Sequence, residues 1–180
     1  MVYCFLAPGF EEIEALATVD ILRRANIEVL TVGVDEDVIV GAHQIPVLAD
    51  LRDFQITLDS SLEAVILPGG MPGTLNLQKS ECVQKSIDYA VLNDKYVCAI
   101  CAAPLILGHK GLLEGRKATC YPGFEEDLKG AEATGGFVEE DGKFITGKGA
   151  GVAIDFALRI VEKLKSKEEA DKIYSSIQSK

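Results

Sequence analysis

The sequence of 180 residues is poor in positive charge, in cysteine and in long apolar runs. Its 18 lysines and arginines face 28 aspartates and glutamates, and the resulting net charge of -10 repels nucleic acid and anionic membrane surfaces. No apolar run is long enough to cross a bilayer, and no basic region precedes the first apolar residues. Five cysteines are too few, and odd in number, for a secreted disulfide framework. These absences predict a cytoplasmic protein without nucleic-acid or membrane partners.

The glycine-rich segments lack the known phosphate-binding patterns. Gly147-Lys-Gly-Ala-Gly does not end in the Gly-Lys-Ser/Thr of a P-loop, and no Gly-x-Gly-x-x-Gly follows the first apolar run. We therefore expect no nucleotide cofactor.

What the sequence does contain is an alternation of apolar strands and amphipathic helices. The pattern predicts strands over 2–6, 27–32, 64–67, 97–100 and 117–120, and helices over 11–25, 75–92, 152–165 and 167–179, with another from 104. Asp141-Gly142 predicts a hairpin over 137–146, and residues 38–49 form a hairpin or an irregular excursion. This order predicts one α/β domain over residues 1–180, with a doubly wound, mostly parallel sheet and helices on both faces.

Cys101 stands where an apolar strand runs into Cys-Ala-Ala-Pro and a helix. In such sheets the carboxyl ends of the strands line the ligand crevice, and the following helix offers free N–H groups. The helix dipole and these N–H groups favour a thiolate. A buried structural cysteine is the alternative. Cys98, three residues earlier, is expected to point to the opposite face of the sheet, which disfavours a disulfide between the two.

Three glutamates, Glu11, Glu12 and Glu14, open the first helix at the same sheet edge. Glu11 and Glu14 share a helix face, whereas Glu12 is turned away and is expected only to complement the helix dipole. A carboxyl held beside a thiol would be desolvated, and it could then serve as a general acid or base. Leu67-Pro-Gly-Gly-Met-Pro-Gly adds a turn whose N–H groups could face an oxyanion.

Four ordered motifs make the chain recognisable. They are Leu6-Ala-Pro-Gly-Phe-Glu-Glu-Ile-Glu, Val65-Ile-Leu-Pro-Gly-Gly-Met-Pro-Gly, Ala99-Ile-Cys-Ala-Ala-Pro, and Gly149-Ala-Gly with Asp155-Phe-Ala-Leu. With them the chain resembles the ThiJ/PfpI superfamily, in the branch of the parkinsonism-associated deglycase and its bacterial homologues, over nearly its whole length.

The resemblance implies a flavodoxin-like fold, a homodimer and a set of site residues. It makes Cys101 the reactive cysteine, Glu14 the glutamate that hydrogen-bonds its sulfur, and Gly70 and Ala102 the backbone donors. Glu11 is a further candidate for binding substrate at this edge.

The chain departs from the family at two positions. Protease-like members carry histidine directly after the cysteine, where this chain has Ala102, so peptidase activity is not expected. The parkinsonism-linked members place a histidine near the site where this chain has Tyr121, which either hydrogen-bonds a substrate oxygen or simply packs.

The sequence thus predicts a glyoxalase III-like enzyme that uses Cys101 and Glu14 on small reactive carbonyls such as methylglyoxal, without metal or cofactor. The related proteins also imply a deglycase activity on glycated proteins. The alternative is a redox-sensing or chaperone-like stress protein, in which Cys101 is oxidised and nothing is turned over.

Overall fold

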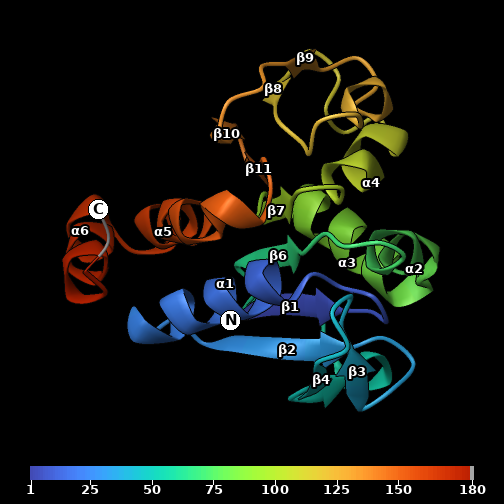
Figure 1. Ribbon diagram of the computed structural model, residues 1–180, viewed down its shortest axis with the longest axis vertical. Coiled ribbons are helices and arrows are strands. Elements are labelled where there is room, and N and C mark those ends of the chain that lie inside the picture. Colours follow the sequence, from blue (N-terminus) through green and yellow to red (C-terminus); the bar gives the residue numbers. More distant parts are fainter. Residues whose placement is uncertain (179–180) are drawn as a thin grey trace.

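A seven-stranded sheet runs through the centre of the molecule (Figure 1). The computed structural model describes residues 1–178. The strand order is β10-β11-β7-β6-β1-β2-β5, and every neighbouring pair is parallel except β10 with β11. Because the connections run outward in both directions from β1 and β6, the chain is doubly wound in the flavodoxin-like order. This confirms the fold class expected from the sequence.

The elements that build this domain follow one another along the chain as alternating strands and helices. The strands of the central sheet are β1 (Val2–Leu6), β2 (Val29–Gly33), β5 (Leu51–Arg52), β6 (Ala64–Leu67), β7 (Tyr96–Ile100), β10 (Val138–Asp141) and β11 (Phe144–Gly147). The α-helices are α1 (Glu12–Arg24), α2 (Gly73–Lys79), α3 (Glu81–Leu92), α4 (Pro104–His109), α5 (Ala153–Leu164) and α6 (Lys167–Ser176). The remaining strands form two small sheets, β3 (Val38–Val40) with β4 (Pro46–Leu48) and β8 (Lys117–Ala118) with β9 (Glu132–Ala133). Three short 3-10 turns are η1 (Asp53–Gln55), η2 (Glu125–Asp127) and η3 (Ala150–Val152).

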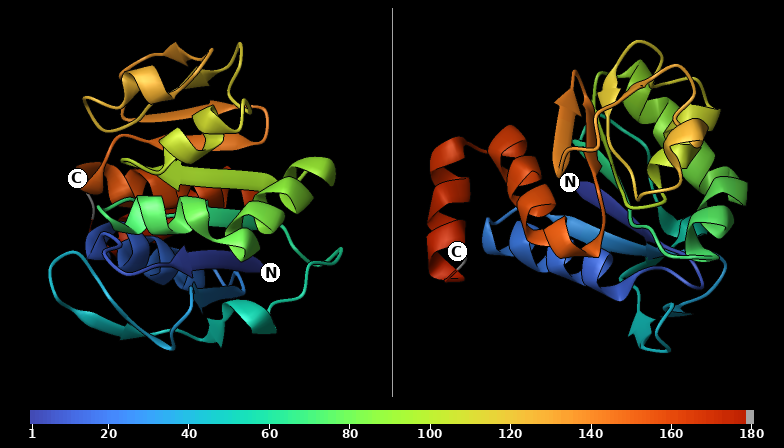
Figure 2. Two further views of the ribbon diagram at one scale, coloured as in Figure 1. Left: turned by 90° about the vertical axis from the view of Figure 1, so that its right-hand side faces the viewer. Right: turned by 45° about the horizontal axis from the view of Figure 1, so that its top comes forward.

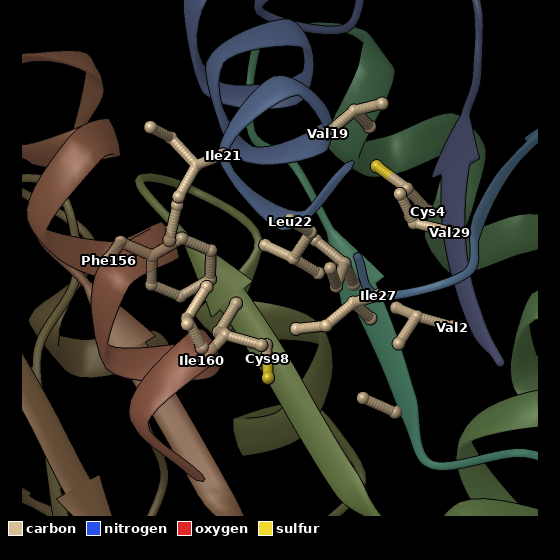
Figure 3. Packing of buried hydrophobic residues seen from close by; sticks show 14 of the residues in the cluster. Val2, Cys4, Val19, Ile21, Leu22, Ile27, Val29, Cys98, Phe156 and Ile160 are labelled. Atoms are coloured by element: carbon tan, nitrogen blue, oxygen red, sulfur yellow. The ribbon is translucent and has the colours of Figure 1, made fainter. Parts of the chain in front are cut away.

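Helices cover both faces of the sheet (Figure 2). Alternate residues of the buried strands point into two separate apolar clusters, as the period of two in a strand requires. One cluster joins the sheet to α1, α5 and α6, and Figure 3 shows part of it. The other joins the sheet to α2, α3 and α4. The strands are rigidly held between these layers, so the loops at their carboxyl ends have fixed positions.

The hairpin predicted over 137–146 is present, and of the two alternatives for residues 38–49 the structure contains the hairpin. β10 and β11 pair antiparallel around Asp141 and Gly142, and β3 pairs antiparallel with β4 within the 38–49 excursion. Among the described residues no helix combines the length and the apolar character needed to span a membrane.

The single helix predicted over 75–92 is wrong, because the chain breaks at Ser80. Ser80 has an extended backbone, and its side chain accepts a hydrogen bond from the N–H of Val83 at 3.4 Å. A serine that caps a following helix in this way replaces the intrahelical bonds that a continuous helix would supply. The terminal helix was predicted to reach residue 179, which lies outside the described residues; α6 ends at Ser176.

The strand predicted over 117–120 was also wrong in its extent. Only Lys117–Ala118 is extended in a ladder, and it pairs with β9 instead of joining the central sheet. Beyond it, the N–H of Thr119 donates to the hydroxyl of Thr146 at 3.0 Å. A side-chain acceptor therefore takes the place of a ladder partner, and no local sequence pattern reports such a distant contact.

Candidate active site

Three loops meet at the carboxyl ends of adjacent parallel strands. They follow β1, β6 and β7, and they carry Glu11, the Gly69-Gly70 turn and Cys101 respectively. The N–H of Glu11 donates to the carbonyl of Gly69 at 2.9 Å, which ties the first loop to the second. The strand order reverses at β1 and β6, so this is the edge at which open α/β sheets form their ligand crevice.

Cys101 lies on a sharp bend. Its φ is +65°, in the left-handed region that non-glycine residues adopt only at a cost. Its N–H donates to the carbonyl of Gly147 at 2.8 Å, and its carbonyl accepts from the N–H of Tyr121 at 2.7 Å. Pro104 is the first residue of α4. Proline suits this position because the first N–H groups of a helix have no intrahelical acceptor. The bend leaves the Cys101 side chain partly exposed, as the sequence predicted.

The left-handed backbone also changes which way Cys101 points. Cys98 lies in the apolar cluster beneath α1 and α5, and Cys101 packs against the same cluster. The expectation that the two side chains take opposite faces was wrong, because the strand alternation ends at the bend. Both are free thiols.

Glu14 is the group that meets the thiol. Its side chain is buried, and its Oε2 accepts from the N–H of Gly69 at 2.8 Å. The carboxyl lies beside Cys101, because a Cβ on Gly69 would lie 2.7 Å from both its Oε2 and the Cβ of Cys101. Its other oxygen, Oε1, is buried without a hydrogen-bond partner in the described part of the chain. A carboxyl in this position is satisfied when it carries a proton and donates it to the sulfur.

Burial controls the protonation of both groups. It raises the pKa of Glu14 from 4.5 to about 7, against the hydrogen bonds from Cys101 and Gly69 that lower it. Burial, the charge of Glu14 and its hydrogen bond raise the pKa of Cys101 from 9.0 to about 12, while the N–H groups of Ala102 and Gly70 lower it. Burial of the thiol thus opposes the thiolate that the start of α4, a helix of six residues, was expected to favour.

The pair can still supply a nucleophile through its shared proton. When Glu14 is neutral, its charge no longer opposes ionisation of Cys101, and its O–H can donate to the thiolate. The thiolate then exists together with a protonated carboxyl.

The turn after β6 requires glycine at both Gly69 and Gly70. Gly70 has a φ of +90°, and a Cβ on it would lie 2.5 Å from the backbone nitrogen of Glu11. Gly69, which the sequence reasoning did not single out, is equally constrained, because a Cβ there would lie 2.7 Å from both the Cβ of Cys101 and the Oε2 of Glu14. The repeated glycine was the available signal, since close backbone approach is one of its two uses.

Glu12 is placed differently from the expectation. It is buried, and its carboxylate accepts from the N–H of His43 at 2.7 Å and lies 2.9 Å from the Nδ1 of the same residue. Burial acts to raise its pKa, but the hydrogen bonds from His43 and Ile45 outweigh it and lower the pKa. Glu12 therefore fastens the 41–45 loop to α1 and does more than complement the helix dipole.

Glu11 lies beside this contact, with its Oε2 3.4 Å from the Nδ1 of His43. Among the described residues, Glu11, Glu12 and His43 form the one group of three ligand atoms close enough to hold a metal ion, within 4.8 Å of one another. The hydrogen bonds between Glu12 and His43, with the ion pair between Glu11 and His43, already account for the arrangement.

Tyr121 is half-exposed and borders a shallow hollow of about 370 Å³. The lining is mostly apolar and consists of Tyr121, Pro122, Phe137, Lys148, Gly149, Ala150, Gly151 and Val152. Because the Tyr121 N–H binds the Cys101 carbonyl, this hollow lies next to the bend. Of the predicted residues, Cys101, Glu14, Gly70, Ala102 and Glu11 come together at the sheet edge, and Tyr121 stands beside them.

Comparison with known proteins agrees with this geometry. The family model of the DJ-1/PfpI family matches residues 1–163. Protein DJ-1 homolog B of Arabidopsis thaliana is 40% identical over 168 residues, which are 92% of this chain but 38% of the plant protein. The chain thus spans well under half the length of that relative. The glutathione-independent glyoxalase DJR-1.2 of Caenorhabditis elegans is 31% identical over 172 residues, 91% of this chain and 87% of that protein.

The fold is shared with solved structures. The crystal structure of a cysteine-to-alanine mutant of a DJ-1 superfamily protein from Salmonella typhimurium superposes with a TM-score of 0.93 at 35% identity, covering 99% of this chain and 98% of the other. With a matching family model over most of its length, relatives above 30% identity and this common fold, the chain belongs to the DJ-1/PfpI family.

Proposed function

We propose that this protein is a cofactor-independent enzyme that uses Cys101 to convert small 2-oxoaldehydes, with methylglyoxal as the test substrate, into 2-hydroxy acids. The observation that carries the proposal is the position of the buried Glu14 carboxyl beside Cys101, since both the Oε2 of Glu14 and the Cβ of Cys101 lie within 2.7 Å of the place that a Cβ on Gly69 would take. A nucleophile and a proton carrier share one site there, with the N–H groups of Gly70 and Ala102 beside the sulfur.

The reaction follows from these positions. The sulfur of Cys101 bonds to the aldehyde carbon, its proton passes to Glu14, and the Gly70 and Ala102 N–H groups stabilise the oxyanion. Glu14 protonates that oxygen to give a hemithioacetal. Glu14 then removes the proton from C1 and returns a proton to C2 through an enediol, which leaves a lactoyl thioester. Water adds to the thioester and releases lactate and the free thiol. The sum is methylglyoxal plus water to lactate, with no external oxidant or reductant.

The family relationship supports this assignment. A relative that matches 91% of this chain is named a glutathione-independent glyoxalase, and a protein-borne thiol is what such a reaction needs in place of glutathione. Glu11 and Tyr121 are the proposed substrate contacts, since Glu11 adjoins Gly70 and Tyr121 adjoins Cys101. Ala102 follows the nucleophile, so we assign no peptidase function.

We also propose that the chain acts as a cytoplasmic homodimer. The supporting feature is an exposed apolar surface on the outer side of α1 and α5. Ile13, Leu16 and Ile154 are 57%, 37% and 40% exposed there. Exposed apolar side chains on neighbouring helices are typical of association surfaces.

The decisive experiment compares methylglyoxal consumption and lactate formation by wild type, Cys101→Ser and Cys82→Ser. We expect Cys101→Ser to lose at least about 100-fold in kcat, because a hydroxyl lacks the nucleophilicity of the thiol. Cys82→Ser should match wild type, since Cys82 lies on α3 and bonds the carbonyl of Asp53. Glu14→Gln should lower kcat by about 100-fold or more, because the amide cannot carry the proton.

Lactate formation by Cys101→Ser at the wild-type rate would overturn the proposal. A wild-type protein that produces no lactate, yet gains oxygen on Cys101 under mild peroxide, would instead identify the redox-sensing alternative.

A further inference from the structure

The strained backbone of Cys101 must be held from both sides. A residue at φ +65° returns to an ordinary conformation unless its surroundings prevent it. The structure provides two direct restraints, the Gly147 carbonyl on the N–H of Cys101 and the Tyr121 N–H on its carbonyl. The first restraint is secure, because Gly147 belongs to β11 and pairs with Ile100 in the central sheet.

The second restraint is not part of the sheet. β8 ends at Ala118, so Tyr121 belongs to a loop, and Tyr121 is itself half-exposed. A loop N–H can hold a strained carbonyl in place only if the loop is itself fixed.

Thr119 fixes this loop through two hydrogen bonds. Its N–H donates to the hydroxyl of Thr146 at 3.0 Å, and its own hydroxyl donates to the carbonyl of Gly136 at 2.7 Å. Both threonines are only 1% exposed. Water therefore does not compete for the contact between Thr119 and Thr146, and the buried N–H has no alternative partner if the hydroxyl is removed.

Thr146 and Gly147 are consecutive on β11. The carbonyl of Gly147 holds the N–H of Cys101 directly, and the hydroxyl of Thr146 holds its carbonyl indirectly, through Thr119 and Tyr121. One short piece of a central strand thus restrains both ends of the bend.

We propose that Thr146 is a positioning residue for Cys101, and that its hydroxyl keeps the bend in the conformation that presents the sulfur to Glu14 and substrate. The inference rests on the proposed function, in which Cys101 is the nucleophile. Thr146 touches neither substrate nor sulfur in this scheme, and it acts through the 119–121 loop.

The test uses Thr146→Val, which keeps the shape of the side chain and removes the hydroxyl, and Thr146→Ser, which keeps the hydroxyl. The matched control is Thr31→Val. Thr31 is a buried strand threonine whose hydroxyl accepts the N–H of Asp50 at 2.9 Å. It lies on β2, which β1 and β6 separate from β7. Urea unfolding measures the stability of each variant, and peptide mass spectrometry measures the rate at which iodoacetamide alkylates Cys101.

We expect Thr146→Val to slow alkylation of Cys101 and to lower kcat for methylglyoxal, each about ten-fold, with KM unchanged within two-fold. Thr146→Ser should stay within two-fold of wild type. Thr31→Val should lose stability but keep both rates. Unchanged rates in Thr146→Val would overturn the inference. So would an equal loss of rate in Thr31→Val, because the loss would then follow stability alone.

A second measurement does not depend on folding of Thr146→Val. In wild type and in Thr146→Ser, the amides of Thr119 and Tyr121 should exchange with solvent at rates within about three-fold of each other, because opening the first contact releases the second. Exchange at Tyr121 more than ten-fold faster than at Thr119 would contradict the coupling. Alkylation and exchange require no turnover, so they decide this inference even if wild type proves inactive on methylglyoxal and the proposed function fails.

Discussion

At the scale of single residues, the reactivity of Cys101 depends on where its proton goes. The thiol and Glu14 share a buried space in which two negative charges are unfavourable together, and this space allows one charge at a time. The left-handed bend exposes the sulfur, while the carboxyl controls whether it is charged. Neither residue would have this chemistry in water.

The burial of Glu14 gives a prediction for the pH dependence of stability. Its pKa rises from 4.5 in the unfolded chain to about 7 in the fold, so between these values the folded state binds the extra proton. The contribution of Glu14 is therefore fully present below about pH 4.5 and is lost as the pH rises through 7. The loss is on the order of 3 kcal/mol, at about 1.4 kcal/mol for each pH unit.

Urea unfolding at pH 5 and pH 8 measures this loss. Glu14→Gln should become less sensitive to pH than wild type over this interval, by on the order of 3 kcal/mol. Glu81→Gln, at an exposed position on α3, should follow the wild-type pH dependence. If Glu14→Gln and wild type change in parallel, Glu14 is charged throughout and the shared-proton scheme fails.

At the scale of elements, the β3–β4 hairpin is fastened to α1 by one carboxylate. Glu12 is the first residue of α1, and it accepts the N–H groups of His43 and Ile45 from the loop that joins the two strands. A Cβ on Gly41 would overlap the Glu12 carboxylate, so the loop also closes over it. These contacts hold the hairpin loop beside Glu11.

We expect Glu12→Ala to lower the free energy of unfolding by about 2 kcal/mol, because the partly buried N–H groups of His43 and Ile45 lose their acceptor. Amide exchange in residues 41–45 should accelerate by more than ten-fold. Glu81→Ala is the matched control, since Glu81 is likewise the first residue of its helix but is exposed, and it should cost at most about 0.5 kcal/mol. Equal effects of the two substitutions would show that Glu12 acts only through the helix dipole.

The elements also show how far the sequence could be read. Short continuous apolar runs and the helical period located β1, α1, β6, β7 and α5, because these patterns reflect burial against the sheet. Ser80 broke a helix whose periodicity continued across it. The Thr119 contact with Thr146 replaced a strand, and the burial of Glu12 depended on a loop thirty residues away. The contacts of Thr119 and Glu12 depend on residues far away in the sequence, which a local pattern cannot report.

For the site, the sequence predicted where the groups lie but not how they are protonated. Strand ends followed by Cys101 and the Gly-Gly turn placed the groups at one edge, since parallel strands end together. The protonation of Cys101 was not predictable, because it depends on how deeply the helix layer buries the pair.

At the scale of the whole molecule, the outer side of α1 and α5 carries the exposed apolar side chains of the proposed dimer surface. Ile13 and Leu16 on α1 lie on the same side of the sheet as Ile154 on α5, and all three are exposed. Their helices pack against each other in one layer (Figure 1). A copy of the chain bound there would cover the outer side of the helix that carries Glu11 and Glu14.

We expect light scattering to give a molecular mass of twice the 19.4 kDa of one chain. Ile13→Glu should shift it to the monomer mass, because a charge would be buried without a partner. Leu92→Glu, at an exposed position at the end of α3, should leave the mass unchanged. A monomer at all concentrations in wild type, or a dimer that survives Ile13→Glu, would contradict the proposed surface.

The two edge strands of the central sheet are poorly suited to pairing with a strand of another molecule. At one end β10 carries consecutive acidic residues, Glu139, Glu140 and Asp141, and at the other β5 is only two residues long. Charged side chains on an edge strand disfavour pairing with a strand of another molecule, and two residues offer too few free backbone groups to template one. Within the described residues, the central sheet therefore has no long, uncharged edge from which a continuous sheet could grow between molecules, while a helical surface stays available for specific pairing.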